Sequence, residues 1–247
     1  MRLMGSLRIA MWSGPRNIST AMMRAWENRS DTVVWDEPFY GDYLRETGFD
    51  HPMRDDILET CETNWREVVA RLTGPVPDGK SVFFQKHMTH HMLPHIDRTW
   101  MADVKNCFLI RDPKQVIASY AIKRDFMTFE DIGFDLQAEL FDDVCQITGN
   151  PPPVLDASDV LTNPEGILRR LCAELGIKFS EQMLSWPAGR RESDGVWARH
   201  WYAKVEESSG FATYVENDIQ LPDQHLALAE RAEVAYQALY KHRLRAN

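Results

Sequence analysis

The residues between Leu7 and Asn28 have the types and spacing needed to bind an anion. The letters L-R-I-A-M-W, S-G-P-R-N-I-S-T and A-M-M-R-A-W-E-N predict a short buried strand, a loop and the first turns of a helix. The groups that could contact an anion are a turn-forming pair, a cation and two hydroxyls, at Gly14, Pro15, Arg16, Ser19 and Thr20. Backbone N–H groups converge at a helix N-terminus, so the loop predicts a phosphate-sized anion site. In the alternative interpretation the hydroxyls only cap the helix.

Three more charged residues follow predicted strands elsewhere in the chain. Glu37 comes after T-V-V-W, Lys86 after S-V-F-F-Q and Arg111 after K-N-C-F-L-I. In a sheet of parallel strands the carboxyl ends meet at one edge, and ligands bind outside that edge. We therefore expect these three residues and Arg16 to lie together. The stretch K-H-M-T-H-H adds His87 and two further histidines at the end of the third strand.

The elements that must position these residues alternate between strand and helix. Strands are predicted at residues 7–12, 32–35, 81–85, 105–110 and 154–155. Helices are predicted at 21–28, 55–72, 112–124, 128–148 and 163–175, with a last one from about 222. The segment 189–202 shows no clear periodicity and is predicted to be a loop that folds over other parts of the chain. This alternation predicts a single three-layer α/β domain over residues 1–247, with a mainly parallel sheet of about five strands.

The overall composition limits the possible partners. The chain has 247 residues, with 28 basic against 37 acidic residues and a net charge of −9. This balance disfavours nucleic acid and anionic membranes and leaves small polyanions. The four cysteines are widely spaced and match no zinc or C-x-x-C pattern, as expected for thiols in a reducing compartment. The sequence has no stretch of the roughly 18 to 20 apolar residues that a membrane-spanning helix requires, so we expect a cytoplasmic protein without a transmembrane segment.

The loop differs from the common nucleotide-binding pattern G-x-x-x-x-G-K-[ST]. That pattern needs a lysine directly before the hydroxyl residue, because the lysine reaches the β and γ phosphates. Here Ser19 holds the lysine's place, Ile18 replaces the second glycine, and Arg16 places the cation earlier in the loop. An ATP- or GTP-hydrolysing enzyme is therefore poorly supported, and only Asp36 or Asp112 is available to bind magnesium at a strand end.

Two motifs resemble the sulfotransferases that use 3′-phosphoadenosine 5′-phosphosulfate (PAPS). The loop motif of that family, P-[KR]-x-x-[ST]-[ST], is similar to P-R-N-I-S-T at 15–20, with Ile18 where glycine is frequent. The second family motif is a strand followed by R-[DN]-P-x-x-x-x-x-S. It is reproduced by F-L-I-R-D-P-K-Q-V-I-A-S-Y, which contains Arg111 and Ser119. The resemblance implies the three-layer P-loop-type fold of the family.

The resemblance extends from residue 7 to about residue 200. V-L-D-A-S-D-V-L-T-N-P-E-G-I-L looks like a later strand, loop and helix start of the family, with Ala-Ser in place of its usual aromatic-acid pair. Near the C-terminus R-R-E-S-D-G-V-W resembles the lid motif R-K-G-x-x-G-x-W. It retains Arg190, Arg191, Gly195 and Trp197, whereas Glu192 replaces the first glycine of the lid.

The resemblance implies that PAPS is bound through two cationic pockets. The 5′-phosphosulfate would lie on the loop and the helix N-terminus, at Gly14, Pro15, Arg16, Asn17, Ser19 and Thr20. The 3′-phosphate would lie on the second motif and the lid, at Arg111, Ser119, Arg190, Arg191 and Gly195. Arginine suits both pockets because a guanidinium makes paired charge-assisted hydrogen bonds with a phosphate. The product would be 3′,5′-adenosine bisphosphate, and the family generally works without a metal.

Sulfuryl transfer needs a cation at the leaving group and a base at the acceptor hydroxyl. Arg16 is the first candidate for the cation and Lys86 the second. For the base, Glu37 in D-E-P-F resembles the E-P motif of carbohydrate-type sulfotransferases, whereas His87 lies roughly where small-molecule members have K-T-H. The next two histidines are further candidates. Without the resemblance, the acidic pair before the proline would be a polar turn and the histidine stretch a solvated connection. The sequence has no H-E-x-x-H pattern, so no metal site is expected.

Two other functions remain compatible with the sequence. One is a nucleotide or small-molecule kinase with a degenerate loop, which would need magnesium and ATP. The other is a catalytically silent nucleotide-binding protein, which would keep the pockets and transfer nothing. The expected acceptor is a small-molecule or carbohydrate hydroxyl, and the E-P motif favours a sugar or a similar alcohol. The sequence identifies neither the acceptor nor the oligomeric state.

Overall fold

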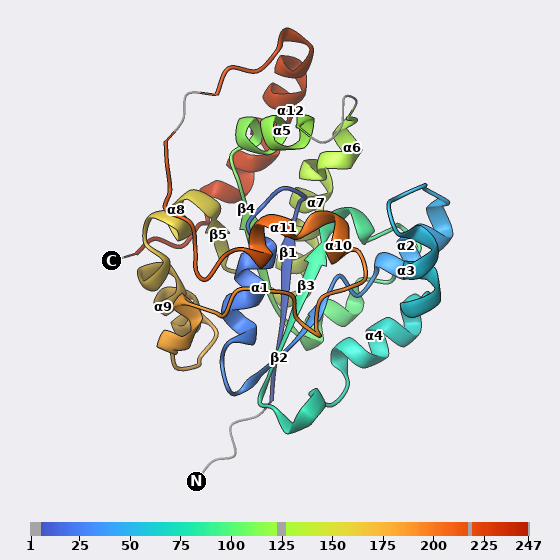
Figure 1. The fold of residues 1–247 in the computed structure, drawn as a ribbon, viewed down its shortest axis with the longest axis vertical. Coiled ribbons are helices and arrows are strands. Elements are labelled where there is room, and N and C mark those ends of the chain that lie inside the picture. The colour runs from blue at the N-terminus through green and yellow to red at the C-terminus, as the bar shows by residue number, and fades with distance from the viewer. Residues whose placement is uncertain (1–5, 123–126, 217–218, 247) are drawn as a thin grey trace.

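Five parallel strands form the centre of the fold, as the computed structural model in Figure 1 shows. The structure describes residues 6–122, 127–216 and 219–246. The strands are β1 (Leu7–Ser13), β2 (Thr32–Asp36), β3 (Val82–Met88), β4 (Lys105–Ile110) and β5 (Val154–Asp156). Their order in the sheet is β2-β3-β1-β4-β5, and every neighbouring pair is parallel. The prediction of a mainly parallel sheet of about five strands is confirmed.

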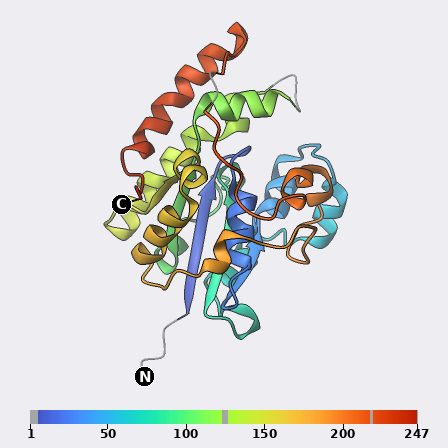
Figure 2. The ribbon, with the colours of Figure 1, turned by 60° about the vertical axis from the view of Figure 1, so that its left-hand side comes forward.

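Helices cover both faces of the sheet (Figures 1 and 2). One face packs against α4 (Trp65–Thr73), α5 (Pro113–Ala121), α7 (Phe134–Thr148) and α12 (Asp223–Tyr240). The other face packs against α1 (Ser19–Glu27), α8 (Ala157–Thr162) and α9 (Pro164–Glu174). The predicted three-layer α/β architecture is confirmed. Within the described residues, none of the helices has both the length and the apolar composition that crossing a membrane would require.

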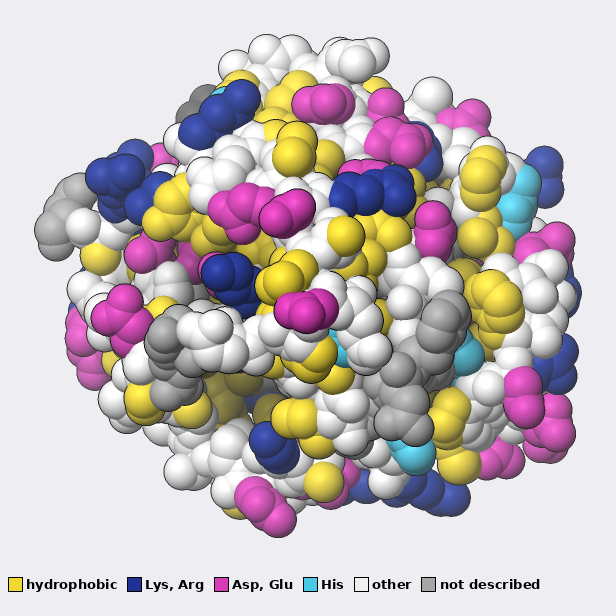
Figure 3. Space-filling view, turned by 90° about the horizontal axis from the view of Figure 1, so that it is seen from above, with side chains coloured by type: hydrophobic (Ala, Val, Ile, Leu, Met, Phe, Trp, Pro, Cys, Tyr) yellow, Lys and Arg dark blue, Asp and Glu magenta, His cyan; other side chains and the backbone are white. Residues whose placement is uncertain are grey.

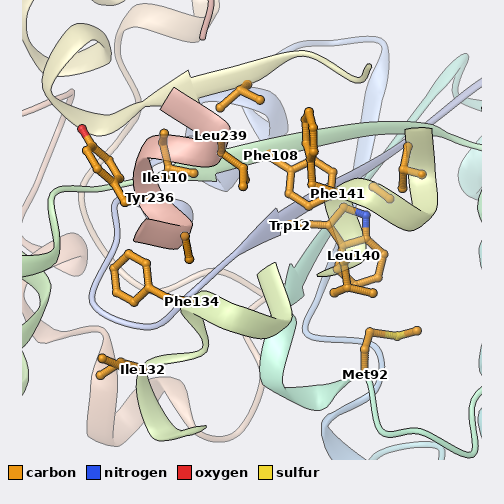
Figure 4. Close-up of a cluster of buried hydrophobic side chains, with 14 of the residues drawn as sticks. Trp12, Met92, Phe108, Ile110, Ile132, Phe134, Leu140, Phe141, Tyr236 and Leu239 are labelled. Atoms are coloured by element: carbon orange, nitrogen blue, oxygen red, sulfur yellow. The ribbon is translucent and has the colours of Figure 1, made fainter. Parts of the chain in front are cut away.

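Successive side chains of each strand point to opposite layers, as strand geometry requires. In β1, Trp12 joins the core under α7 and α12, whereas Met11 joins the core under α1 and α9. Figure 4 shows the first of these cores, in which Trp12, Phe108 and Phe141 pack with residues of α12. Phe108 and Phe141 meet edge to face with ring centroids 5.5 Å apart. Each fully buried side chain of this kind contributes roughly 1.5–3 kcal/mol, so the two cores fix the sheet and its loops.

A smaller third core lies beside the segment that follows β2. It is enclosed by α2 (Tyr40–Thr47), α3 (Arg54–Thr60) and α10 (Ala198–Trp201). Figure 2 shows the orange helices α10 and α11 (Ala203–Glu206) against the α2–α3 region. The segment 189–202, predicted as a loop, therefore includes a short helix, and it does fold back over an earlier part of the chain.

Two helices that were predicted as continuous are each divided in the structure. Residues 55–72 contain both α3 and α4, because the side chain of Asn64 accepts a hydrogen bond from Arg66 N at 3.1 Å and starts a new helix. Residues 128–148 contain α6 (Phe129–Ile132) and α7, because Gly133 between them has a φ of 68°. That left-handed conformation ends one helix and redirects the next.

The helix starts predicted from capping residues are confirmed. Asp112 accepts a hydrogen bond from Gln115 N at 3.0 Å and begins α5, and Asn163 accepts one from Gly166 N at 2.9 Å and begins α9. The helix predicted to reach residue 124 ends at Ala121, and residues 123–124 lie outside the described part of the chain. Short 3₁₀ turns occupy Pro77–Gly79, Thr89–His91, Thr99–Asp103 and Glu181–Leu184.

The connections that leave β1 and β4 turn to opposite faces of the sheet. α1 follows β1 and packs on one face, while α5 follows β4 and packs on the other. Neighbouring strands whose helices diverge in this way open a crevice at their carboxyl ends, and ligands bind in such crevices. Arg16 and Arg111 lie in the two segments that border this crevice. The fold therefore brings the two predicted anion-binding motifs together.

Candidate active site

The loop between β1 and α1 is held to the neighbouring strand by Asn17. Its side-chain amide donates a hydrogen bond to the carbonyl oxygen of Leu109 in β4 at 2.9 Å. Its side-chain oxygen accepts a hydrogen bond from Ile18 N at 2.9 Å. Arg16 has a φ of 58°, a left-handed conformation that is uncommon for a residue other than glycine. Asn17 therefore fixes the path of the loop, and the loop holds Arg16 in an unusual backbone conformation at the crevice.

Helix α1 begins without a side-chain cap. Its N-cap residue is Ile18, which has no side-chain acceptor atom, and Ser19 and Thr20 are the first two residues inside the helix. The interpretation of these two hydroxyls as caps is therefore wrong. The backbone N–H groups of the first turn carry a partial positive charge, and a ligand anion can bind them. At Gly14 an added Cβ would lie 3.0 Å from the carbonyl oxygen of Ile132, so a larger residue would disturb the packing of the loop on α6.

Arg16, Arg111 and Ser119 lie together at the crevice between β1 and β4. Arg16 Nε donates a hydrogen bond to Ser119 Oγ at 3.1 Å, and Arg111 Nη1 donates one to the carbonyl oxygen of Arg16 at 2.8 Å. Arg111 Nε also donates to Gln115 Oε1 at 3.1 Å. Within the described part of the chain, neither arginine forms an ion pair with a carboxylate. Both guanidinium charges are left for an external anion.

The surroundings of the two arginines disfavour their positive charge. Burial lowers the pKa of Arg16, and burial together with the nearby charge of Arg16 lowers the pKa of Arg111. Arginine nevertheless stays protonated at physiological pH. Two like charges in a partly buried crevice, next to a helix N-terminus, suit a ligand with more than one anionic group. The residues present therefore fit a phosphorylated or sulfated nucleotide.

A second cluster of charges lies where β2 and β3 end, and Lys86 is at its centre. Its ammonium group donates hydrogen bonds to Asp36 Oδ1 at 2.7 Å, to Glu37 Oε1 at 2.6 Å and to the Tyr202 hydroxyl at 2.7 Å. These three partners use all three protons of the ammonium group. Burial alone would lower the pKa of Lys86, but the charges of Asp36 and Glu37 reverse this effect and raise it well above its ordinary value. Lys86 is therefore a permanent cation whose charge is neutralised inside the protein.

Glu37 differs from the other members of this cluster because one of its oxygens lies outside the network. Oε1 binds Lys86, whereas Oε2 lies 3.9 Å from His91 Nδ1. The backbone of Glu37 has a φ of 45°, a strained conformation of the kind found at functional sites. Burial raises the pKa of Glu37, Lys86 opposes this rise and Asp36 adds to it, with a net increase. The carboxylate is therefore a stronger base than an exposed glutamate.

His87, a predicted catalytic candidate, lies in the core. It points to the face of the sheet opposite Lys86, where it stacks on Trp12 with ring centroids 4.3 Å apart. Its side chain is 1% exposed, and burial lowers its pKa to about 3. The physical reason is that β3 continues to Met88, so Lys86 and His87 are successive strand residues with opposite directions. The structure does not place His87 where it could act as the base.

The other two histidines of the stretch lie among aromatic rings near Glu37. His91 is buried and stacks on Tyr40 with ring centroids 4.5 Å apart, and the ring of His90 meets it edge on at 4.5 Å. Burial lowers the pKa of His91 well below its ordinary value, and His90 and His51 reinforce the effect, so the His91 ring is neutral. Among the described residues, no three His, Cys, Asp or Glu side chains are grouped so that they could hold a metal ion.

The predicted lid residues are Arg190, Arg191 and Gly195. Gly195 N lies 3.5 Å from Asp36 Oδ2, beside the Lys86 network. Arg191 is held within its own segment, by hydrogen bonds to Asp194 and Pro187, and Arg190 is exposed. In the described ranges, no hydrogen bond or ion pair joins these three residues to Arg111 or Ser119. The structure therefore groups the lid motif with Glu37 and Lys86 rather than with the second phosphate motif.

Both groups of residues lie at the carboxyl edge of the sheet, the end of the molecule that Figure 3 views from above. The surface there is hollowed, and Lys and Arg side chains lie at the edge of the hollow. Because β3 separates β2 from β1, the strand ends that Glu37 and the Arg16 loop follow are two strand spacings apart, or about 10 Å.

Asp36 and Tyr202 complete the Lys86 network, a role that the sequence did not indicate for either residue. Asp36 was expected only as a possible magnesium ligand or part of a polar turn, and Tyr202 only as the end of the segment 189–202. The hydroxyl of Tyr202 donates a hydrogen bond to Asp36 Oδ2 at 2.7 Å across 166 residues of chain. No local pattern predicts such a contact, because it depends on how the late segment packs on the sheet.

Comparison with known proteins identifies a matching family and similar folds. A family model described as "Sulfotransferase domain" matches residues 7–242. The sulfotransferase domain from the curacin biosynthetic pathway is similar over 94% of this chain and 98% of its own, with a TM-score of 0.52 and 15% identity. A sulfotransferase from Alicyclobacillus acidocaldarius is similar over 97% of this chain and 98% of its own, with a TM-score of 0.55 and 13% identity. At such identities the likeness shows a shared fold.

Two curated relatives from Arabidopsis thaliana carry a different kind of name. Branched-chain-amino-acid aminotransferase-like protein 1 is 37% identical over 234 residues, which are 95% of this chain and 42% of the relative. Branched-chain-amino-acid aminotransferase-like protein 2 is 34% identical over 234 residues, 95% of this chain and 41% of the relative. The chain spans less than half the length of these relatives, so their names describe proteins with a large part that this chain does not match.

Proposed function

Because the chain belongs to the sulfotransferase domain family, we propose that it transfers a sulfuryl group from PAPS to a hydroxyl of a small-molecule or carbohydrate acceptor. The supporting observation is that Arg16 and Arg111 share a crevice at the N-terminus of α1, where neither has a carboxylate partner among the described residues. PAPS carries two separate anionic groups, and this arrangement matches them. The proposal treats residues 1–247 as one sulfotransferase-like domain. A cytoplasmic location stays a prediction that rests on cysteine usage.

The proposed donor site follows the loops at the crevice. The 5′-phosphosulfate would bind the β1–α1 loop and the first turn of α1, at Gly14, Pro15, Arg16, Asn17, Ser19 and Thr20. The 3′-phosphate would bind Arg111 and Ser119, which lie beside Arg16. We leave Arg190, Arg191 and Gly195 out of this pocket, because their contacts are with their own segment and with Asp36.

The proposed reaction is an in-line displacement at sulfur. The acceptor oxygen forms a bond to sulfur while the bond between sulfur and the bridging oxygen of the 5′-phosphate breaks, and 3′,5′-adenosine bisphosphate leaves. Charge develops on the leaving phosphate, so a cation held beside it stabilises the transition state. Arg16 suits this role because its loop holds it at the N-terminus of α1, where the helix dipole acts in the same direction.

The proposed general base is Glu37. It would take the proton of the acceptor hydroxyl through Oε2, the oxygen that Lys86 leaves free. Its raised pKa makes the carboxylate a stronger base than an exposed glutamate. Lys86 has no proton left for a ligand, so in this proposal it orients Glu37 and does not contact the leaving group. His91 is a weaker candidate because its pKa is strongly lowered.

Transfer of radiolabel from PAPS to a panel of alcohols tests this function. The panel should include sugars, phenols and small aliphatic alcohols, and it should be run without added metal. We expect a labelled product with the wild-type protein and none with Glu37→Gln. Arg231→Ala, which removes an exposed ion pair between α12 and α7, serves as a matched arginine control and should transfer normally. Phosphoryl transfer from Mg-ATP to the same alcohols, without sulfuryl transfer, would contradict the proposal and support the kinase alternative.

A further inference from the structure

Residues 189–206, here named the docking segment, return from late in the chain to the edge of the sheet. The segment is closed on itself by a hydrogen bond from Gly189 N to the carbonyl oxygen of Glu206 at 2.7 Å. It is anchored to α1 by an ion pair between Asp194 and Arg24 at 2.7 Å, in which both side chains are at most 1% exposed. Buried ion pairs of this kind are costly to break, so the segment has a defined docked position.

The docking segment delivers one hydroxyl to the Lys86 network. Tyr202 is 5% exposed, and its hydroxyl accepts hydrogen bonds from Lys86 Nζ at 2.7 Å and from Trp197 Nε1 at 3.2 Å. The same hydroxyl donates to Asp36 Oδ2 at 2.7 Å. One donor and two acceptor sites are the full capacity of a phenol. Tyr202 is therefore saturated by residues of the protein and is not arranged to bind substrate itself.

The direction of Glu37 depends on this hydroxyl through Lys86. A lysine side chain has four rotatable bonds, and three oxygen partners fix the end of this one: Asp36, Glu37 and Tyr202. Asp36 is fixed in turn, because one of its oxygens binds Lys86 and the other binds Tyr202. Glu37 is the one member of the group with a carboxylate oxygen left outside these bonds. Without the phenol hydroxyl, one ammonium proton and one Asp36 oxygen would lose a buried partner.

We propose that Tyr202 is a positioning residue for the general base: its hydroxyl holds the Lys86 ammonium against Glu37, so the base is correctly placed only while the docking segment lies on the sheet. This inference rests on the proposed function, in which Glu37 takes the acceptor proton. It assigns to the lid-like part of the chain a task on the acceptor side of the reaction. The two phosphate pockets are formed without it.

The variant Tyr202→Phe tests this role because it keeps the ring and removes only the hydroxyl. We expect kcat, measured with PAPS and the most active alcohol of the panel, to fall roughly tenfold to a hundredfold, since small misplacements of a catalytic group have effects of this size. The affinity for 3′,5′-adenosine bisphosphate and the KM for PAPS should stay within about twofold of wild type, because Arg16 and Arg111 make no use of Tyr202.

Tyr236→Phe is the matched control. Tyr236 is also buried, and its hydroxyl donates a hydrogen bond to a buried aspartate, Asp156, at the same distance of 2.7 Å. Both variants lose a buried tyrosine–aspartate hydrogen bond, and Tyr202→Phe also removes one partner each from Lys86 and Trp197, so it should lose more stability than Tyr236→Phe. A purely structural role for Tyr202 predicts a loss of stability and an unchanged kcat for the folded protein, as in Tyr236→Phe. A positioning role predicts that Tyr202→Phe alone lowers kcat.

A second measurement does not depend on the acceptor. The Lys86 ammonium group can be followed by ¹⁵N NMR, with its signal assigned by its absence in Lys86→Met. A buried ammonium with three acceptors should exchange its protons slowly with water. We expect faster exchange in Tyr202→Phe and unchanged exchange in Tyr236→Phe. If Tyr202→Phe does not yield folded protein, Trp197→Phe removes the 3.2 Å bond to the Tyr202 hydroxyl and should give a smaller change in the same direction.

The outcomes separate this inference from the proposed function. Wild-type kcat and slow Lys86 exchange in Tyr202→Phe would overturn the positioning role and leave the sulfotransferase proposal intact. Equal losses of kcat in both Tyr→Phe variants, or a loss of bisphosphate affinity in Tyr202→Phe, would overturn it as well. A wild-type protein that neither binds the bisphosphate nor transfers sulfuryl groups would instead overturn the proposed function.

Discussion

The Arg16–Arg111 crevice and the Lys86 network hold buried charge in opposite ways. In the crevice two guanidinium groups lie close together, and among the described residues neither is paired with a carboxylate. In the network one ammonium group is bonded to two carboxylates and a phenol, and nothing of its charge is left for a ligand. The first region is built to be completed by an anion, whereas the second is complete in itself.

This difference assigns the two regions different tasks. Uncompensated buried charge is unfavourable, so binding of an anion should stabilise the crevice as well as fill it. A compensated network is rigid, because each member is held by the others, and rigidity is what a general base requires. Side chains whose charge is not compensated within the protein are therefore assigned to ligand binding. Side chains whose charge is compensated are assigned to positioning the general base.

Glu37→Gln should have the largest effect. Glutamine keeps the size of the side chain and its bond to Lys86, but it cannot accept the acceptor proton. We expect sulfuryl transfer to fall by about 10²–10⁴-fold, as is typical for loss of a general base. Binding of 3′,5′-adenosine bisphosphate should be unchanged when measured by calorimetry. Full turnover in Glu37→Gln would show that Glu37 is not the general base.

Lys86→Met should unfold the protein more easily. The substitution leaves two carboxylates, Asp36 and Glu37, buried side by side without their cation. Removing one partner of a buried charge network costs about 3–5 kcal/mol, so the free energy of unfolding in urea should fall by about that amount. Lys80→Met, a substitution of a lysine that binds a backbone carbonyl at the surface, should change stability little. Equal stabilities of the two variants would contradict a compensated network.

Arg111→Ala should weaken ligand binding and should change the stability of the unliganded protein little. Arg111 has no ion pair with a carboxylate among the described residues, so its charge would be used by the bound ligand, and its loss should weaken 3′,5′-adenosine bisphosphate binding by roughly tenfold to a hundredfold. The unliganded protein should lose little stability, because the variant also relieves repulsion with Arg16. Thermal unfolding with and without the bisphosphate measures both effects. A large loss of stability without ligand would show that the crevice is not an uncompensated site.

Asp36→Asn should shift the pH dependence of activity. The base works in its ionised form, and the pKa of Glu37 is raised, so activity should fall on the acid side at a pH above the ordinary glutamate pKa. Asp36 contributes to that rise, and its neutralisation should move the acid limb of kcat/KM to lower pH. Asp31→Asn, a substitution directly before β2, is the control and should leave the acid limb of kcat/KM at the same pH. A shift to higher pH would contradict the assignment of Glu37 as the base.

The elements of the fold could be predicted from the sequence because their signals are local. Apolar periodicity and capping residues such as Asp112 and Asn163 gave the strands and the starts of six of the twelve α-helices in the described residues. The divided helices could not be seen in the same way. Gly133 and Asn64 lie within continuous apolar periodicities. Only the folded backbone shows that Gly133 ends α6 and begins α7, and that Asn64 begins α4 after α3 has ended at Thr60.

The candidate site was predictable only in part. The positions of Arg16 and Arg111 after predicted strands indicated that both lie at one edge of the sheet, and the structure brings them together. Ser119, which the resemblance assigned with Arg111 to a separate pocket, also contacts Arg16. His87 was misplaced because strand β3 is longer than its apolar letters indicate, and a strand that continues by one residue past Lys86 turns the next side chain to the other face. The contact of Tyr202 with the network depends on long-range packing, which the spacing of residues does not encode.

Calorimetric titration of the wild-type protein tests the central claim most directly. The ligands are 3′,5′-adenosine bisphosphate and ATP, each with and without magnesium. The proposed function predicts tight binding of the bisphosphate that does not change with magnesium, because two arginines and a helix N-terminus hold its phosphates without a metal. Selective binding of ATP that requires magnesium would contradict it and would point to a kinase.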